Sequence, residues 1–431
     1  MKVDVFRPLA AVVVPFALLI SSTCFVAGAL AEDDKAAPPA AAPKGPAVLQ
    51  KSPVAQSMPS QIIHKALVQD IVRVGERLFI AGERGHIGWS DDNGATWTQA
   101  KVPTIQDINA LYFVTADVGW AVGHDGNIFN TIDGGKTWSM QLDGLAFNLV
   151  RAQAQVDKQA AALEAKQAQL DEAQARLDEA QAAAKPKQKL IDQLQEKVDA
   201  ITEEVDELDF QVRDAEKILN EENAPWPLMD VWFRDLNTGF AVGAFNAFLM
   251  TEDGGKTWVD VSARLQNPDS LHLNAVGGFE STVFVLGEAG MIFRSVDGGK
   301  TWSKLESPED GSFFAIHVSK LESGKLDVII AGLEGSIFRS IDSGDNWDDM
   351  GHVLNYNLNS IYVGDNGLLI LVGNDGAILR STDGGVTLEP YRQQNQLTLS
   401  SMVVAANGNY VLAGAGGIQI LKADQLVPHK E

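Results

Sequence analysis

The chain has 431 residues, with 39 Gly, 9 Trp and a formal net charge of −23 at pH 7. A chain of this length is too long for a single ordinary hydrophobic core unless the fold is a repeat or a barrel. The many glycines and tryptophans favour a fold with many turns and large buried rings over a helical one. The negative charge argues against a nucleic-acid binder that relies on phosphate contacts and against a polybasic membrane-surface protein.

Residues 1–31 predict an export signal. Two basic residues lie within the first seven positions, an apolar run follows from Leu9 to Ile20, and the small-residue sequence Ala-Leu-Ala ends at Ala31. The alternative is an uncleaved membrane anchor. Residues 32–58 predict a linker rich in Pro and Ala, and no later segment has the apolar length of a membrane span. We therefore expect a periplasmic or otherwise exported protein without a stable membrane span after cleavage near Ala31.

A short motif of the form Ser/Thr-x-Asp-x-Gly-x-Thr-Trp recurs along the chain in four complete copies and two altered ones. We expect its Asp to accept hydrogen bonds from turn amides, its Gly to adopt a positive φ, and its Trp to bury a large ring between strands. These residues are therefore predicted to be structural. They are Asp92, Asp133, Asp253, Asp297, Asp342 and Asp383, with Trp97, Trp138, Trp258, Trp302 and Trp347.

A second motif, a strand followed by a Gly-x-x-Gly turn and another strand, precedes each Asp motif. Another apolar segment lies upstream of it, so that each repeat of 41 to 45 residues supplies three or four short antiparallel strands. Such repeats predict propeller blades, and a seventh copy at 413–422, without an Asp motif, predicts seven blades. We expect residues 60–68 to supply the missing outer strand of the last blade and to close the ring.

The predicted all-β, seven-bladed β-propeller is interrupted once. Blades one and two occupy residues 59–146 and blades three to seven occupy residues 227–424, while residues 147–226 lack the repeat and have a helix-forming composition. Apolar residues alternate at intervals of three and four from Ile191 to Leu219, which is typical of a coiled-coil seam. A break around Pro186 divides the segment into two helices of similar length.

We expect these helices to form an antiparallel α-helical coiled-coil hairpin, because the connection between them is short. A domain-swapped dimer is the alternative. The hairpin follows the last strand of blade two, so that it should leave the propeller on the face of the Gly-x-x-Gly turns. Its base is acidic, with ten Asp or Glu and two Lys or Arg between residues 199 and 222. This charge indicates either a solvated surface or an arm that docks on a basic partner.

The Gly-x-Ile-x-Arg-Ser and Asp-Gly-Gly-x-Thr-Trp sequences resemble those of BNR/Asp-box propellers. Among these, the chain is most similar to the photosystem II stability/assembly factor-like family, over about residues 60–146 and 227–422. The resemblance implies an exported scaffold without enzyme activity or cofactor that binds a membrane-protein complex. Bacterial relatives of the group occur with RND-type transporters, which implies an envelope transport complex as a client. The helical arm departs from the typical family member and puts a photosystem client in doubt.

The resemblance also implies arginines in successive blades. Arg294, Arg339 and Arg380 directly precede the Ser of the Asp motif in blades four to six. We predict that they form a basic patch that binds a partner, since guanidinium groups suit carboxylates bidentately. The alternative is that they pair with acidic neighbours between blades and only stabilise the ring. The other blades carry different residues at this position, namely Trp89, Asn130, Met250 and Leu421.

A sialidase-like glycoside hydrolase is the main alternative function, because sialidases share the Asp motif. That chemistry normally needs two carboxylates at a defined separation. The sequence has no Arg-Ile-Pro motif, no His-Glu-x-x-His pattern and no pair of acids that stands out among those at the turns. We therefore predict no catalytic residue, no metal and no cofactor. The turn acids are Glu83, Asp125, Glu288, Glu334 and Asp375.

Overall fold

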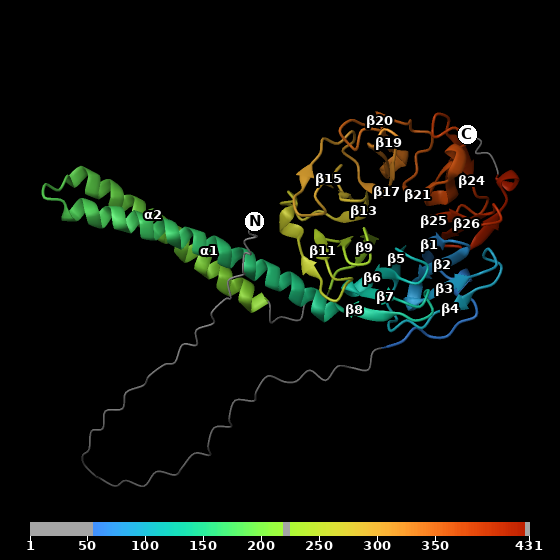
Figure 1. Cartoon of the computed structure of the whole chain (residues 1–431), viewed down its shortest axis with the longest axis horizontal. Coiled ribbons are helices and arrows are strands. Elements are labelled where there is room, and N and C mark those ends of the chain that lie inside the picture. The colour runs from blue at the N-terminus through green and yellow to red at the C-terminus, as the bar shows by residue number, and fades with distance from the viewer. Residues whose placement is uncertain (1–54, 219–224, 427–431) are drawn as a thin grey trace, which may run out of the picture. The chain divides into compact units, whose positions relative to one another are not determined.

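The structure, a computed structural model, describes residues 55–218 and 225–426. The predicted export signal and nearly all of the predicted linker lie outside the described residues. Within them, strands form seven antiparallel sheets, six with four strands and one with three. The first strands of neighbouring sheets contact one another in a cycle that closes between the first and the last sheet, as Figure 1 shows. The fold is therefore a β-propeller.

Each sheet follows the order of the repeat. The first strands are β1 (Val68–Val74), β5 (Ile108–Phe113), β9 (Leu228–Phe233), β13 (Leu273–Phe279), β17 (Phe313–Lys320), β21 (Leu358–Val363) and β25 (Leu399–Val404). The second strands are β2 (Arg77–Gly82), β6 (Gly119–Gly123), β10 (Gly239–Gly243), β14 (Thr282–Gly287), β18 (Leu326–Gly332), β22 (Leu369–Gly373) and β26 (Tyr410–Gly414).

The third and fourth strands flank the Asp motif. The third strands are β3 (Ile87–Ser90), β7 (Ile128–Thr131), β11 (Ala247–Thr251), β15 (Ile292–Ser295), β19 (Ile337–Ser340), β23 (Ala377–Ser381) and β27 (Gln419–Leu421). The fourth strands are β4 (Thr98–Gln99), β8 (Ser139–Leu142), β12 (Val259–Asp260), β16 (Ser303–Lys304), β20 (Asp348–Asp349) and β24 (Glu389–Arg392).

The core lies between neighbouring sheets rather than at one centre. Each second strand is buried almost throughout, because sheets pack on both of its faces. Between the second and third sheets, for example, Trp120 of β6 stacks on Phe233 of β9 with ring centroids 3.5 Å apart. Between the first and second sheets, Phe79 stacks on Phe113 at 4.2 Å. Such layers hold each blade to the next.

The expected outer strand at residues 60–68 is wrong. This segment contains the short 3₁₀ helix η1 (Ile63–Lys65), and the last sheet keeps three strands among the described residues. The carbonyl oxygen of His64 accepts one hydrogen bond, from the amide of Ile418 at 2.7 Å. Ile63 is buried in the apolar layer between the first and last sheets. Ring closure instead comes from contacts of β1 with β25 and β26, including a 2.6 Å bond from Ser400 Oγ to Val68 O.

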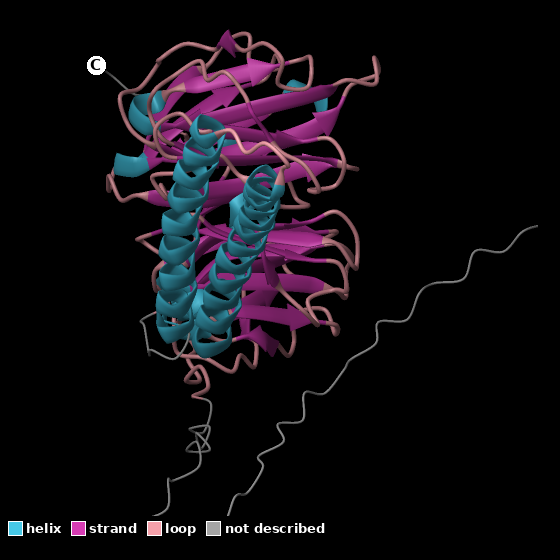
Figure 2. Cartoon of the chain, turned by 90° about the vertical axis from the view of Figure 1, so that its left-hand side faces the viewer, coloured by secondary structure: helices cyan, strands magenta, loops and turns pink. Residues whose placement is uncertain are grey.

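The interruption of the repeat consists of helices α1 (Gly144–Ala182) and α2 (Gln188–Ile218), which run side by side (Figures 1 and 2). Lys166 of α1 forms an ion pair with Glu204 of α2. No described helix is both long and apolar enough to cross a membrane. An apolar cluster joins the two helices further along. The buried members of this cluster are Ala173, Leu177, Val198 and Ile201.

Candidate protein-binding surfaces

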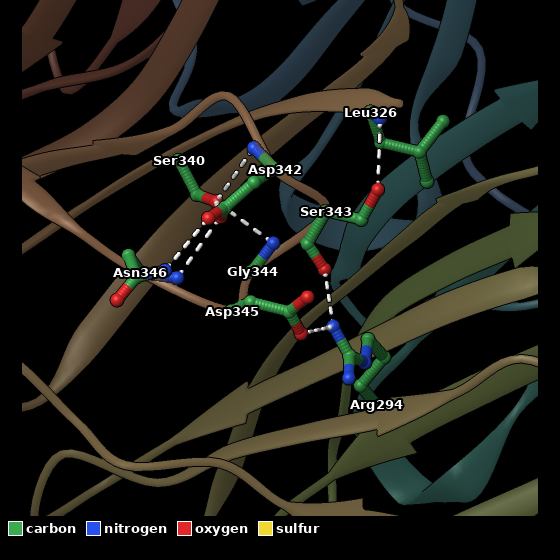
Figure 3. Close-up of polar contacts among 8 residues, drawn as sticks. All are labelled: Arg294, Leu326, Ser340, Asp342, Ser343, Gly344, Asp345 and Asn346. Carbon is green, nitrogen blue, oxygen red and sulfur yellow. Dashed lines mark hydrogen bonds and ion pairs between the residues drawn. The ribbon is translucent and has the colours of Figure 1, made fainter. Parts of the chain in front are cut away.

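The Asp motifs close hairpin loops, as Figure 3 shows for the fifth sheet. Asp342 accepts hydrogen bonds from the Ser340 hydroxyl at 2.8 Å, from the amide of Asn346 at 2.9 Å and from its side chain at 2.8 Å. The amide of Gly344, which has a φ of 89°, donates to Ser340 Oγ at 2.8 Å. These bonds are local, so that the Asp carboxylate stabilises its own loop.

The same bonds explain the acidity of the motif aspartates. Hydrogen bonds from Asn346 lower the pKa of Asp342 to about 2, and those from Thr96 lower the pKa of Asp92 to about 2. An ionised carboxylate accepts these bonds better than a protonated one. Each pattern identifies a turn-stabilising group, since a general acid at neutral pH would instead need a raised pKa.

Arg294, Arg339 and Arg380 lie at the same end of the third strands of three consecutive sheets, and each contacts the next sheet. Arg294 Nη1 donates to Ser343 O at 2.7 Å and to Asp345 at 2.6 Å (Figure 3). Arg339 Nη1 donates to Gly384 O at 2.6 Å. Two of these three acceptors, Ser343 O and Gly384 O, are backbone carbonyls of the next Asp-motif loop, and the third is the Asp345 carboxylate of that loop. These bonds favour the ring-stabilising alternative, while partner binding by these arginines stays a prediction.

Other blades make the equivalent contact with residues that the sequence comparison of blades did not single out. In each, a side chain donates to the carbonyl of a motif Gly in the next sheet at 2.8 to 3.1 Å. Blades one to three have Trp89, Asn130 and Met250 where blades four to six have an arginine. In these three blades, an arginine or glutamine at another position of the repeat makes the contact. The donors and acceptors are Arg77 and Gly134, Gln141 and Gly254, and Arg264 and Gly299.

The turn acids lie in different blades and have separate local contacts. Asp375 forms an ion pair with Arg392, and Glu288 accepts a 2.8 Å hydrogen bond from the amide of His272. Within the described ranges, no group of three or more His, Cys, Asp or Glu side chains is arranged to hold a metal ion.

Two aspartates on first strands tie neighbouring blades together near the propeller axis. Asp70 of β1 accepts from the amide of Leu111 at 2.9 Å, and Asp230 of β9 accepts from the amides of Val276 at 2.9 Å and Val231 at 2.8 Å. Loss of hydration raises the pKa of both carboxyl groups, that of Asp230 to about 7. Repulsion from the Asp70 carboxylate adds to the rise for Asp230.

We expect Asp230→Asn to reduce the pH dependence of stability. Because the pKa of Asp230 is raised in the folded state, folding favours its protonated form, and stability should fall as pH rises from about 4 to about 7. Melting temperatures at pH 5 and pH 8 measure this effect: the native chain should lose more than the Asp230→Asn variant. Asp269→Asn, at an exposed position, controls for the loss of one charge. Equal losses in the native chain and the Asp230→Asn variant would contradict the prediction.

The foot of the arm, which we define as the first two turns of α1, is built into the propeller. The Asp143 side chain caps α1 by accepting from the amide of Ala146 at 2.9 Å. The Phe147 ring is fully buried and packs on Gly126 in the Gly-x-x-Gly turn of the second sheet, where any larger residue would clash. The foot therefore lies on the Gly-x-x-Gly face, as the insertion point predicts, whereas the arginines lie at the other end of the third strands.

Arg151 joins the foot to the third sheet. Its Nη1 lies 3.5 Å from the nearly buried carboxylate of Asp260, and its guanidinium donates to Phe245 O at 3.3 Å and Asn246 O at 3.4 Å. The guanidinium also lies 4.7 Å from the centre of the Trp226 ring. A groove of about 930 Å³ runs between α1 and the outer part of the third sheet beside these residues.

Comparison with known proteins gives partial sequence matches. Residues 216–352 match the family model of the photosynthesis system II assembly factor YCF48, and residues 48–150 match that of the DUF6242 β-propeller domain. No curated protein matches the chain.

Solved structures share the fold at low sequence identity. A structure of YCF48 bound to D1 peptide is 14% identical, with a TM-score of 0.51 over 89% of this chain and 99% of that one. YCF48 from Cyanidioschyzon merolae is also 14% identical, with a TM-score of 0.51 over 86% and 99%. The WD40 propeller domain of Doa1 is 10% identical, with a TM-score of 0.50 over 86% and 96%. The family match and the shared fold confirm the predicted resemblance: the chain is a BNR-type β-propeller similar to the photosystem II assembly factors.

Proposed function

We propose that this protein is an exported, non-enzymatic assembly or accessory factor that binds a membrane-protein complex of the cell envelope. A protein-binding role is supported by the similarity to YCF48, which in one structure holds a D1 peptide. The seven sheets act as a seven-bladed scaffold, and α1 and α2 form a coiled-coil arm. Export follows from cleavage of residues 1–31, and an RND-type transporter system is the proposed client.

The observation that carries this proposal is the rigid foot of the arm. A long helical pair attached only for solubility would need no aromatic ring buried between two sheets of the propeller. Here Asp143, Phe147 and Arg151 hold the first turns of α1 against the second and third sheets. An arm held in this way presents its length and the adjacent Gly-x-x-Gly face to the same partner.

Deleting the arm should strongly reduce capture of the membrane-protein partner. We would replace residues 152–217 with a short Gly-Ser linker, because this leaves Phe147, Arg151 and Trp226 in place and preserves the propeller core. Full-length and deleted proteins would be compared by affinity capture from envelope membranes. We expect the amount of captured membrane protein to fall at least tenfold, because the deletion removes the proposed binding surface of the arm and leaves the propeller folded.

The triple substitution of Arg294, Arg339 and Arg380 with Ala is the matched test of the opposite face. Capture that survives arm deletion but fails in the triple variant, at equal circular dichroism, would assign binding to the arginine face and reject the arm. A full-length protein that captures no membrane protein at all would reject the assembly-factor role itself.

A further inference from the structure

The Gly-x-x-Gly turn of the third sheet differs from the others in carrying an exposed aromatic side chain under backbone strain. The third residue of these turns has a positive φ in each of the first six sheets, and it is polar or small in the other five. In the third sheet it is Phe245, with a φ of 51°, followed by Asn246 in place of Gly, with a φ of 59°. A bulky residue rarely adopts this conformation. The equivalent residues are Arg84, Asp125, Ala289, Glu334 and Asp375.

The Phe245 ring is only partly covered by its neighbours. The Phe245 side chain is 46% exposed, so that its burial does not compensate for the strained backbone. Strained residues that persist without a packing role are concentrated at binding and catalytic sites. A large exposed aromatic ring in such a conformation therefore points to recognition rather than to stability.

Phe245 is part of a continuous apolar surface at the foot of the arm. Its ring lies 4.8 Å from the ring of Trp226 and 4.7 Å from that of His272. Trp226 is 37% exposed and lines the groove between α1 and the third sheet. Two leucines of α1, Leu145 and Leu149, are about half exposed and line the same groove. Aromatic residues held rigidly beside a groove are typical interface hot spots.

The net negative charge of α2 near this surface favours a partner segment that carries basic side chains. The ion pair of Lys166 with Glu204 sets the register of the two antiparallel helices and places residues 209–217 of α2 beside about residues 153–161 of α1. Four residues of this part of α1 line the groove. Residues 199–217 contain eight acidic and two basic residues. Residues 209–217 contain three of these acidic residues and both basic ones, and the five other acidic residues lie further along α2. We call residues 199–217 the acidic wall. The groove itself is lined by Asp157 and Lys158 as well as by Arg151, which pairs with Asp260.

We propose that Trp226 and Phe245 form the apolar floor of a docking site for a basic, apolar segment of the protein partner. Apolar side chains of that segment cover the two rings and the half-exposed leucines, and its lysines or arginines face the acidic wall and the aromatic faces. The proposal deepens the assembly-factor function proposed above, on which it rests, by giving the partner segment a chemistry and a place.

The test uses the full-length mature chain and three labelled synthetic peptides of about fifteen residues, followed by fluorescence anisotropy near physiological ionic strength. One peptide alternates Leu and Lys, the second replaces Leu with Ser, and the third replaces Lys with Glu. We expect the Leu/Lys peptide to bind at least tenfold more tightly than either of the others, since it alone offers both apolar and basic side chains.

The variants Trp226→Ala and Phe245→Gly should each weaken the Leu/Lys peptide about tenfold without any change of charge. Val386→Ala, which alters an 87% exposed side chain in the sixth sheet, should leave its affinity unchanged. Phe245→Gly separates recognition from structure, because glycine accepts a positive φ freely. Its melting temperature should therefore equal or exceed that of the native chain.

Three results would overturn the site. The first is unchanged peptide affinity in Trp226→Ala and Phe245→Gly, and the second is a Phe245→Gly variant that melts several degrees lower. The third is concentration-dependent self-association that these substitutions abolish, which would make a second copy of the chain the occupant. The assembly-factor role is judged separately: native-level capture of the membrane-protein partner by Trp226→Ala would reject this site and leave the function intact.

Discussion

Phe147→Ala is expected to lower the free energy of unfolding by about 3 kcal/mol and to release the foot of the arm from the propeller. The Phe147 ring is fully buried in the apolar layer between the second and third sheets, where Ala146 and Val150 of the same helix pack beside it. Its removal leaves a cavity against Gly126, which has no side chain to fill it. Urea denaturation measures the loss, and amide hydrogen exchange locates it.

The exchange experiment should show faster exchange over residues 144–151 and little change in the second strands of the sheets, because the local unfolding is confined to the foot. Leu149→Ala is the matched control on the same helix. Leu149 is 45% exposed, so that its truncation should cost less than about 1 kcal/mol. Equal costs for the two substitutions would mean that the foot does not depend on the buried ring.

The sequence predicts the blades well because their information is local. The side chain of each motif Asp makes its hydrogen bonds within four residues, as Asp342 does with Ser340 and Asn346, so that these bonds can be predicted from the motif alone. The heptad pattern similarly predicts α2, whose apolar residues face α1. The error at residues 60–68 has a related cause, since Ile63 is apolar as a strand residue would be but packs between the first and last sheets from a 3₁₀ turn.

Contacts between blades could not be predicted in this way. The carbonyl of a motif Gly in the next sheet accepts from Arg339 on a third strand in one blade and from Arg77 on a second strand in another. The repeat register does not align these donors, and only the spatial arrangement of the sheets shows their equivalence. Trp226 was similarly evident only as the end of the insertion, because its neighbour Phe245 comes from a different blade.

Arg339→Ala should destabilise the propeller by about 2 to 4 kcal/mol, the largest expected effect among the three predicted partner-binding arginines. Arg339 donates to both carboxylate oxygens of Asp327, at 2.8 and 2.6 Å, and to Gly384 O at 2.6 Å. Asp327 is only 8% exposed, so that the substitution leaves a nearly buried charge without its partner.

Arg380→Ala is the matched comparison, because Arg380 makes weaker contacts in the adjacent blade. It donates to the Tyr410 hydroxyl at 3.1 Å and lies 3.7 Å from the exposed carboxylate of Glu389. Its loss should cost less than about 1 kcal/mol. Adding Asp327→Ala to Arg339→Ala should recover part of the lost stability in urea denaturation, since the unpaired charge is then removed. The opposite result, in which Arg339→Ala keeps native stability but no longer captures the partner, would show that Arg339 serves recognition. It would support the basic patch predicted from the sequence and contradict a role of Arg339 in holding the blades together.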